Sequence, residues 1–419
     1  MKIVNLPQLA WYETGNLEIT LPESWQVELC HMAGHDRPAL DPVLVKEAIL
    51  HPIGTRPISV AARGKKEICV IFDDMSRPTQ VAPMIPYVLE ELEKADIGDD
   101  QIRFVCALGC HSALTRRDFV KKLGEEVVSR FPIFNHNIVG NCSPVGTTSF
   151  GTELRINAEV VRCDYKIALG SIVPHGFAGF GGGAKIILPG IASFETIAAM
   201  HRMTLSDGES GPVALGGMGC IHGNLMRQNI EEAAVMVGLD FKIDAIVNTW
   251  GETVSVYAGA PEAAFNEGLI EARRHYLTPR AKDCDVVVTN TFAKANEGEG
   301  GVITGFPSVK KTGGDVVLIC NAPEGHVAHY LFGNWGNISS DEFRLVVQLP
   351  QYVERVIVFN EYKDLTAAGF FAPSERVLML DKWDDVLQVL GERRGDGTKV
   401  CVYSSAEIQY CDEGSSIDV

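Results

Sequence analysis

The sequence has no apolar run of the roughly 18 residues that a helix needs to cross a bilayer. The stretch that begins at Met1 also lacks the apolar core of a secretory signal peptide. Basic residues are scarce, because 37 of them stand against 54 acidic residues and the net charge is −17. Such an acidic chain is poorly suited to bind nucleic acid or an anionic membrane. We therefore expect a cytoplasmic protein that has neither of them as a partner.

Recognisable metal-binding and disulfide patterns are also missing. The 11 cysteines are odd in number and scattered, and several lie within apolar runs, as around Cys69 and Cys320. This distribution is typical of reduced cysteines in a core. Cys106 and Cys110 are four residues apart with His111 beside them, but no second pair of ligands follows at the spacing of a zinc site. The sequence therefore argues against a zinc site at this position.

What the chain does have is a glycine-rich stretch from Ser171 to Lys185, which contains five glycines within eight residues. It follows an apolar run, 165–172, that is typical of a buried strand. Glycines allow a backbone to approach a bound group closely, so we expect a ligand here. The stretch is not a Walker A loop, because Lys185 follows Ala184 and precedes Ile186. Histidines and a lysine around it offer a proton-transfer group, a metal ligand and a nucleophilic amine.

A group of polar residues follows another apolar run. The run 67–72 ends in Asp73, Asp74, Ser76, Arg77 and Thr79 before a predicted helix over 84–95, an arrangement suited to an anion or a polar ligand. The residues themselves leave a second interpretation equally open, in which Asp74 and Ser76 only cap the helix and Arg77 pairs with an acid.

Histidines stand at comparable places. His111 follows the apolar run 102–108, and His175 follows the run 165–172. Ligands of open α/β sheets bind at the carboxyl ends of the strands. A single histidine there is more often structural, but two of them favour a functional site. His201 lies in the last turn of a helix predicted over 194–203, where it either turns back toward Lys185 or interacts only with the helix dipole.

The length and the order of the elements predict two α/β domains. A chain of 419 residues is long enough for two cores, and a boundary is expected near residues 275–282. We place it between domains 1–278 and 279–419. Short apolar runs follow this boundary, with helices predicted at 341–348 and 382–390, and this alternation is typical of a doubly wound parallel sheet. The apolar runs in question are 285–289, 315–320, 355–359, 376–380 and 399–403.

Taken together, five motifs resemble the nickel-pincer lactate racemases and related 2-hydroxyacid racemases and epimerases. The similarity extends over most of the chain, although residues after Thr289 match less well. The motifs are Asp74-x-x-Arg77-Pro-Thr79, Gly109-x-His111, Pro174-His175-Gly, Gly-Gly-Gly-Ala-Lys185 and Met200-His201.

The resemblance implies an isomerase with an unusual cofactor, a pyridinium-3,5-bisthiocarboxylate mononucleotide that carries nickel in an S-C-S pincer. Lys185 would be linked to it covalently, and His201 would bind the nickel. The loop of Asp74, Met75, Ser76 and Arg77 would hold its nucleotide portion, with Pro189 nearby. Enzymes that make the cofactor would be transient partners. The N-terminal domain would bind the cofactor and catalyse, and the C-terminal domain would close an active-site cleft.

The implied reaction is the inversion of a 2-hydroxycarboxylic acid through a 2-keto acid, by reversible hydride transfer to the pyridinium. The Cα–H of such an acid is far too weakly acidic for an ordinary side-chain base, which makes a hydride route easier. His111 and His175 would be the paired proton acceptor and donor. An imidazole that titrates near neutrality can take either part.

The expected substrate contacts depart from the family. Lactate racemases use a glutamine and a lysine after the first C-terminal strand, whereas this chain has no lysine at the matching place. Lys294 and Asn296, together with Arg77, are the candidates for contacts with the substrate, and Glu297 or Glu299 would suit additional hydroxyl groups. The substrate is therefore expected to be a small 2-hydroxycarboxylate that is larger or more polar than lactate.

Two other functions remain open from the sequence. Lys185 beside a glycine-rich anion pocket is also what a Schiff-base enzyme with a pyridoxal-type cofactor would have. Alternatively, the chain is a catalytically silent relative that binds a nucleotide or a small acid, which would need Arg77 and the glycines but neither histidine. Nickel content and absorbance distinguish the first alternative from the pincer enzyme.

Overall fold

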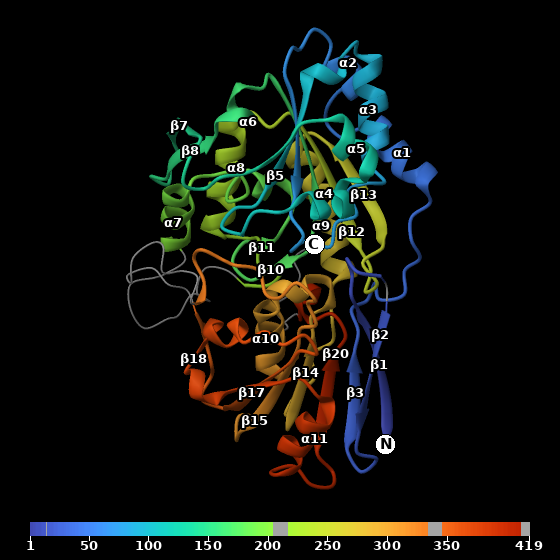
Figure 1. Cartoon of the computed structure of the whole chain (residues 1–419), viewed down its shortest axis with the longest axis vertical. Coiled ribbons are helices and arrows are strands. Elements are labelled where there is room, and N and C mark those ends of the chain that lie inside the picture. The colour runs from blue at the N-terminus through green and yellow to red at the C-terminus, as the bar shows by residue number, and fades with distance from the viewer. Residues whose placement is uncertain (14, 204–216, 334–345, 412–419) are drawn as a thin grey trace. The chain divides into compact units, whose positions relative to one another are not determined.

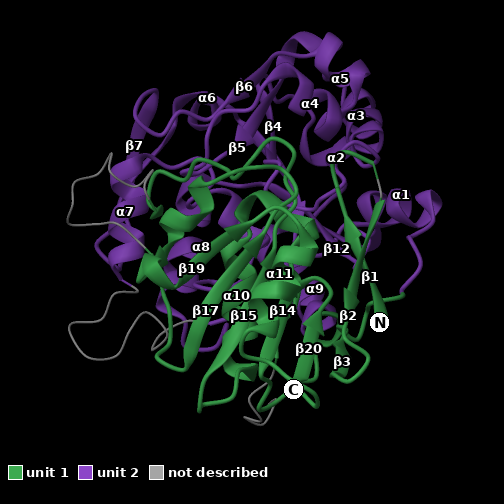
Figure 2. Ribbon diagram, turned by 60° about the horizontal axis from the view of Figure 1, so that its bottom comes forward, with its two compact units in different colours: residues 1–36, 274–419 green, residues 37–273 purple. Residues whose placement is uncertain are grey.

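The computed structural model describes residues 1–13, 15–203, 217–333 and 346–411. Contacts divide the chain into two compact units, which we call unit 1 (residues 1–36 and 274–419) and unit 2 (residues 37–273) (Figure 2). The boundary expected near residue 278 lies close to the return of the chain into unit 1 at Arg274. The first 36 residues group with the C-terminal part of the chain.

Unit 2 is built on a six-stranded sheet with the order β13-β12-β9-β4-β5-β6. All neighbouring strands are parallel except β12 and β13, which are antiparallel. The strands of this sheet are β4 (Ile68–Asp73), β5 (Ile102–Ala107), β6 (Ile133–Asn135), β9 (Tyr165–Ser171), β12 (Phe241–Val247) and β13 (Thr253–Gly259) (Figure 1). Two small antiparallel pairs accompany it: β7 (Cys142–Thr147) with β8 (Glu153–Asn157), and β10 (Pro174–His175) with β11 (Gly179–Phe180).

One face of this sheet forms the largest core of unit 2. Alternate residues of the central strands, such as Ile68, Val70 and Phe72 in β4, point into it and pack against the first five helices. This alternation is what a period of two residues along a strand produces. The helices are α1 (Pro42–Leu50), α2 (Ile58–Ala61), α3 (Ile85–Lys94), α4 (Arg116–Leu123) and α5 (Glu125–Arg130), and the later helices of unit 2 are α6 (Ala158–Arg162), α7 (Phe194–Arg202), α8 (Leu225–Val237) and α9 (Pro261–His275). Two 3-10 helices, η1 (Asp99–Gln101) and η2 (Gly183–Ile186), complete the unit.

Unit 1 contains a second six-stranded sheet, in which all paired strands are parallel, with the order β19-β17-β15-β14-β20-β3. The outer strand β3 comes from the N-terminal segment, which explains why that segment groups with the C-terminal part. The strands are β3 (Gln26–Cys30), β14 (Val286–Asn290), β15 (Gly314–Ile319), β17 (Val353–Phe359), β19 (Val377–Leu380) and β20 (Lys399–Tyr403).

The two faces of this sheet are covered by different elements. Val302 and Phe306, from α10 (Glu299–Gly305) and η4 (Phe306–Ser308), pack on one face. The other face packs against α11 (Trp383–Gly391) and against the hairpin of β1 (Lys2–Gln8) and β2 (Gly15–Leu21). Both faces are therefore buried, as the near-continuous apolar strands predicted. The remaining elements are η3 (Phe292–Glu297), β16 (Val347–Gln348), η6 (Thr366–Phe370), β18 (Phe371–Ala372), η7 (Ser374–Arg376) and η8 (Ala406–Ile408).

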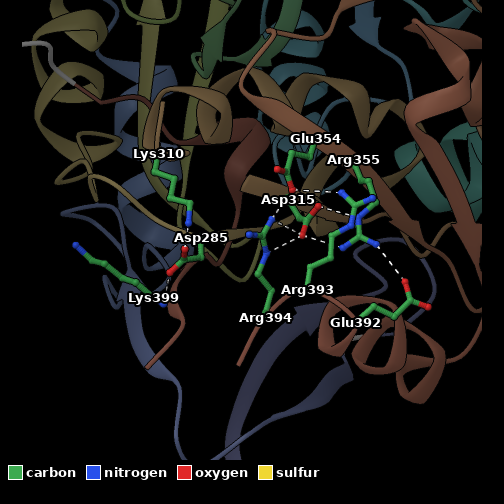
Figure 3. Close-up of polar contacts among 9 residues, drawn as sticks. All are labelled: Asp285, Lys310, Asp315, Glu354, Arg355, Glu392, Arg393, Arg394 and Lys399. Atoms are coloured by element: carbon green, nitrogen blue, oxygen red, sulfur yellow. Dashed lines mark hydrogen bonds and ion pairs between the residues drawn. The ribbon is translucent and has the colours of Figure 1, made fainter. Parts of the chain in front are cut away.

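The amino ends of these strands are held by ion pairs (Figure 3). Asp315, at the start of β15, has no solvent exposure and accepts two hydrogen bonds from Arg355, at 2.9 and 3.0 Å. Arg394 adds a second cation at 2.8 Å from Asp315 and also contacts Glu354 at 2.9 Å. A buried carboxylate between two guanidinium groups keeps its charge compensated. This edge of the sheet therefore has a structural role, and the opposite, carboxyl edge remains for ligands.

Most predicted elements are confirmed, and one is not. The predicted helix 341–348 lies largely outside the described residues, and its last two residues form the strand β16 instead. The helix predicted at 382–390 is confirmed as α11. None of the helices in the described ranges is both long enough and apolar enough to cross a membrane.

Candidate active site

Three adjacent strands of unit 2 bring most of the predicted site residues to one edge of the sheet. Strand β4 lies between β9 and β5, and Asp73 at its end is in register with Ala107 of β5. The Asp74 loop follows β4, the His111 loop follows β5, and His175 follows β9. Parallel strands deliver these loops to the same edge, which is where open α/β sheets bind their ligands.

Asp74 and His111 form a buried, hydrogen-bonded pair. The Nδ1 atom of His111 lies 2.5 Å from Oδ2 of Asp74, and both side chains are less than a tenth exposed. Oδ1 of Asp74 accepts from the hydroxyl of Ser76 at 2.6 Å and from its backbone N–H at 3.0 Å. Because an ionised carboxylate can only accept, Nδ1 of His111 carries a proton, and the lone pair of the neutral ring is on Nε2. His111 is therefore oriented as a proton acceptor.

The charge of Asp74 is stabilised by the same contacts. Burial alone would raise the pKa of Asp74, but the interactions with His111, Arg77 and Ser76 outweigh it and lower this pKa to about 2. Arg77 donates to the backbone oxygen and to the hydroxyl of Ser76, at 3.0 and 2.7 Å. The carboxylate thus remains ionised throughout the neutral range.

A lysine beneath the loop fixes its backbone. Lys122 of α4 has no exposure, and its ammonium group donates to the backbone oxygens of Asp74 and Arg77 at 2.9 and 3.2 Å. It also forms a 2.7 Å ion pair with Asp73, whose other oxygen accepts from Thr79 at 2.5 Å. The motif from Asp73 to Thr79 is therefore held by Lys122 of α4 as well as by its own hydrogen bonds.

His175 has the opposite hydrogen-bonding pattern. Its Nδ1 atom accepts from the backbone N–H groups of Phe177 and Ala178, both at 3.2 Å. A backbone N–H can only donate, so Nδ1 has no proton and the neutral ring carries its proton on Nε2. His175 is thus arranged as a hydrogen-bond donor, whereas His111 is arranged as an acceptor.

Three of the glycines between His175 and Lys185 are required by contacts with other parts of the protein, whereas the sequence led us to expect that they allow the approach of a ligand. A Cβ atom at Gly179 would lie 2.2 Å from the backbone oxygen of Cys220, one at Gly182 would lie 2.9 Å from that of Ser171, and one at Gly183 would lie 2.8 Å from the ring of Phe265. The protein itself therefore fills the space that a Cβ would take. All three also have positive φ angles, between 57° and 77°, which favour glycine.

Two buried charges hold this glycine-rich loop. Arg227 of α8 stacks on Phe265, with its guanidinium carbon 4.1 Å from the ring centre, and donates to the backbone oxygen of Phe180 at 2.9 Å. Asp244 of β12 accepts from the backbone N–H of Gly183 at 2.8 Å and is paired with buried Lys242 at 2.6 Å. The position of Lys185 at the end of this loop is thus set by contacts from two further elements.

His201 is buried in α7 and is a neutral imidazole. Its Nδ1 atom donates to the backbone oxygen of Ile197 at 2.8 Å, which places the lone pair of the ring on Nε2, the form that binds metals. Burial and, to a lesser extent, the charge of Lys185 lower the pKa of His201 to about 4, although the contact with Ile197 opposes this shift. The ring of Phe177 lies 5.9 Å from that of His201 and 6.2 Å from that of His175.

Pro189 belongs to the same edge. The backbone N–H of Gly109 donates to the oxygen of Gly190 at 2.8 Å, and this hydrogen bond joins the His111 loop to the turn that contains Pro189. Met75 is buried beside Asp74. The structure thus connects all predicted cofactor, nickel and proton-transfer residues within unit 2.

The candidate substrate residues other than Arg77 lie in unit 1. Lys294 and Asn296 are in η3, which follows the carboxyl end of β14. Of the two acids considered for extra hydroxyl groups, Glu299 has its Oε2 atom 2.6 Å from Nε2 of His326, and this ion pair is buried. Glu299 is therefore already engaged within the unit.

Comparison with known proteins identifies the family. The N-terminal domain of lactate racemase matches residues 12–211. Lactate racemase from Thermoanaerobacterium thermosaccharolyticum is 31% identical over 290 residues, which are 68% of this chain and 66% of that protein. The chain belongs to the lactate racemase family. The lactate racemase of Lactiplantibacillus plantarum is 29% identical over 304 residues, 70% of this chain and 69% of that protein.

Solved structures agree with the fold. The apoprotein of lactate racemase from T. thermosaccharolyticum superimposes with a TM-score of 0.76 at 23% identity, covering 98% of this chain and all of that one. A protein from Thermotoga maritima gives 0.64 at 18% identity, over 89% of this chain and 98% of that one. The mixed α/β fold with parallel sheets is thereby confirmed. Membership in the family indicates an isomerase of the racemase type.

Several residues that build the site could not be recognised in advance. Lys122, Arg227 and Asp244 touch the predicted loops only from distant parts of the sequence. One signal was present: Lys242 and Asp244 interrupt an otherwise apolar strand, and charges within a buried strand must be paired. The sequence alone does not say with what they pair.

Proposed function

We propose that this protein inverts the configuration of a 2-hydroxycarboxylic acid and depends on a nickel-pincer nucleotide attached at Lys185. The observation that carries the proposal is the complementary state of two histidines at one edge of the sheet. Nε2 of His111 has the lone pair of its ring, and Nε2 of His175 has the proton. Inversion needs a proton acceptor and a proton donor, and these are the two states found.

The residues present fit the cofactor because of the chemical groups that they offer. The glycines add no support, because other parts of the protein fill the space beside them. Lys185 offers the amine for a covalent link. His201 offers a neutral imidazole whose tautomer is fixed by Ile197. The loop from Asp74 to Arg77 would hold the nucleotide portion, with Met75, Ser76 and Pro189. When bound, the cofactor supplies a reversible acceptor for the hydride of the substrate Cα.

The chain's own part in the reaction is proton transfer at the substrate oxygen. His111 takes the hydroxyl proton at Nε2, and the ionised Asp74 stabilises the resulting imidazolium through the 2.5 Å contact. His175 faces the oxygen with an N–H donor. To give its Nε2 proton to the substrate oxygen without becoming an imidazolate, His175 must first take a second proton at Nδ1, which requires release of the two 3.2 Å contacts from Phe177 and Ala178.

We also propose a substrate that is more polar than lactate, with Arg77, Lys294 and Asn296 as contacts. The support is the stretch after β14, in which Lys294 and Asn296 come with two acids, Glu297 and Glu299. Glu299 would have to leave its pairing with His326 to contact an additional hydroxyl group.

The test uses protein produced together with enzymes that make the cofactor. It is incubated with single enantiomers of lactate and of larger polyhydroxy acids, and the opposite enantiomer is measured by chiral chromatography. We expect inversion, fastest for a polyhydroxy acid, and retention of a deuterium placed on Cα, since hydride transfer does not exchange it with water. A pyridoxal-type enzyme would contain no nickel, and a silent relative would invert nothing.

A further inference from the structure

A fully buried glutamate follows strand β20 of unit 1. Glu407 has no solvent exposure and lies in η8. Strand β20 is the direct neighbour of β14 in the sheet, so the segments that follow these two strands leave the same edge. The segment after β14 is η3, which contains Lys294 and Asn296. Glu407 is not among the residues that the sequence motifs pointed to.

The carboxylate of Glu407 meets η3 at the point where this helix is broken. Lys294 has φ −134° and ψ 48°, so η3 consists of two turns that are interrupted at this residue. The backbone N–H of Lys294 donates to Oε1 of Glu407 at 3.0 Å. Farther along, the oxygen of Asn296 accepts from the backbone N–H of Val327 at 2.7 Å. The conformation of the segment is therefore fixed on both sides of the break.

The segment that carries Glu407 is itself firmly held. The hydroxyl of Thr304 donates to the backbone oxygens of Ala406 and Gln409 at 2.8 and 3.2 Å. The side chain of Gln409 accepts from the N–H of Ser405 at 2.9 Å and donates to Thr278 at 3.0 Å. Glu407 thus reaches η3 from a support with little freedom to move, as a residue that positions a neighbouring loop requires.

The burial of the Glu407 carboxyl group is energetically unfavourable, which is unusual for a purely structural residue. Its Oε2 atom is buried and has no hydrogen-bond partner among the described residues. Burial raises the pKa of Glu407 to about 7, although the nearby Lys294 ammonium group and the backbone amides oppose this rise. Apolar side chains of similar size usually fill such a site at least as stably as a buried, incompletely paired carboxyl. A carboxyl kept here indicates a function beyond packing.

We propose that Glu407 is a positioning residue for substrate binding, which holds the break in η3 at Lys294 and so presents Lys294 and Asn296. This inference rests on the proposed function, in which these two residues contact the substrate. Glu407 itself is a positioning residue and not a catalytic one, because its carboxylate accepts from the backbone of η3. Its removal should therefore weaken substrate binding much more than it slows turnover.

Three variants test this inference: Glu407→Ala, Glu407→Gln and, as a control, Thr398→Ala. The control removes a buried hydroxyl group just before β20, at the amino edge of the sheet, where it donates to the backbone oxygen of Gly395 at 2.7 Å. We expect Glu407→Ala to raise KM about tenfold or more, the loss typical of a hydrogen bond to a charged group, with kcat changed less than threefold. Glu407→Gln keeps an oxygen that accepts from Lys294 and should restore KM to within about threefold of the wild-type value. Thr398→Ala should leave KM unchanged, and nickel content should be equal in all variants.

Amide hydrogen exchange across residues 292–297 provides a readout that does not depend on activity. Exchange at the Lys294 amide should be faster in Glu407→Ala than in Glu407→Gln or Thr398→Ala. Unchanged exchange in Glu407→Ala would overturn the inference, and so would faster exchange with an unchanged KM, or an equal rise of KM in Thr398→Ala. If the wild-type enzyme inverts no 2-hydroxy acid, the proposed function fails, and the exchange data alone then decide whether Glu407 holds this loop.

Discussion

Replacing Asp74 by asparagine should reverse the tautomer of His111. In the native protein Oδ1 of Asp74 accepts the backbone N–H of Ser76 at 3.0 Å, while Oδ2 accepts from His111. An asparagine has only one accepting oxygen, and the N–H of Ser76 can only donate, so the oxygen must stay on Ser76. The amide NH₂ then faces Nδ1 of His111 and donates to it. This forces the proton of the neutral ring onto Nε2, which can no longer accept a proton from the substrate.

The magnitude of the effect has two parts. Loss of a positioned general base typically costs on the order of 10² to 10⁴ in rate, so we expect at least a hundredfold fall in kcat. The pKa of Asp74 drops from its ordinary 3.8 to about 2, and since one pKa unit corresponds to about 1.36 kcal/mol, the ionised carboxylate contributes about 2 kcal/mol to stability. Because the pKa in the folded state is lowered, this contribution is complete above about pH 4 and disappears as the pH falls toward 2.

Chiral chromatography measures the rate, and urea unfolding measures the stability. Asp74→Asn should unfold with a free energy about 2 kcal/mol lower at pH 7 and at pH 5, and the difference should shrink below pH 4. Nitrogen NMR of labelled histidine should show the proton of His111 moved from Nδ1 to Nε2. Ser76→Ala, which leaves the contact between Asp74 and His111 in place, serves as the control and should lose less than tenfold. Wild-type turnover by Asp74→Asn would refute the assigned role of His111.

Three further outcomes follow from the site. A peptide map of active enzyme should show a covalent adduct on Lys185, and finding only the unmodified lysine would contradict the cofactor proposal. His201→Ala should lose nickel while its thermal unfolding stays cooperative, whereas full nickel and full turnover would exclude it as the ligand. Arg227→Met keeps an unbranched side chain but cannot donate to Phe180. The melting temperature should therefore fall by several degrees, corresponding to about 1 to 3 kcal/mol. A melting temperature within a degree of the wild-type value would show that Arg227 does not hold the loop.

The sequence predicted the structure well where it depends on residues that are close together along the chain. Apolar runs such as 67–72 and 102–108 are long enough and sufficiently bounded by polar residues to be recognised as strands, and both are confirmed, as β4 (Ile68–Asp73) and β5 (Ile102–Ala107). Their ends also predicted where the polar loops lie, since parallel strands share a carboxyl edge. The contact between Asp74 and His111 is a consequence of that topology, although these residues are 37 positions apart.

Long-range contacts could not be predicted in the same way. The N-terminal strand β3 pairs with β20 near the other end of the chain, and nothing in either segment specifies the partner. The glycines of 179–183 give a similar lesson, because the sequence predicts their freedom but not what occupies the space beside them. That space holds Cys220, Ser171 and Phe265 rather than a ligand, so a glycine-rich loop alone was weak support for a cofactor.

The two histidines show what hydrogen bonds add to a motif. From the sequence, His111 and His175 are equivalent candidates, since each follows a strand. Their Nδ1 atoms have opposite partners, a carboxylate for His111 and two backbone N–H groups for His175. A second ring proton on His111 is stabilised by the negative charge of Asp74. A second ring proton on His175 would have to bind Nδ1 and so displace both backbone N–H groups. A second ring proton should therefore be held more readily by His111 than by His175, and the short Phe177–Ala178 turn is the part of the loop that must adjust when Nδ1 of His175 takes a proton.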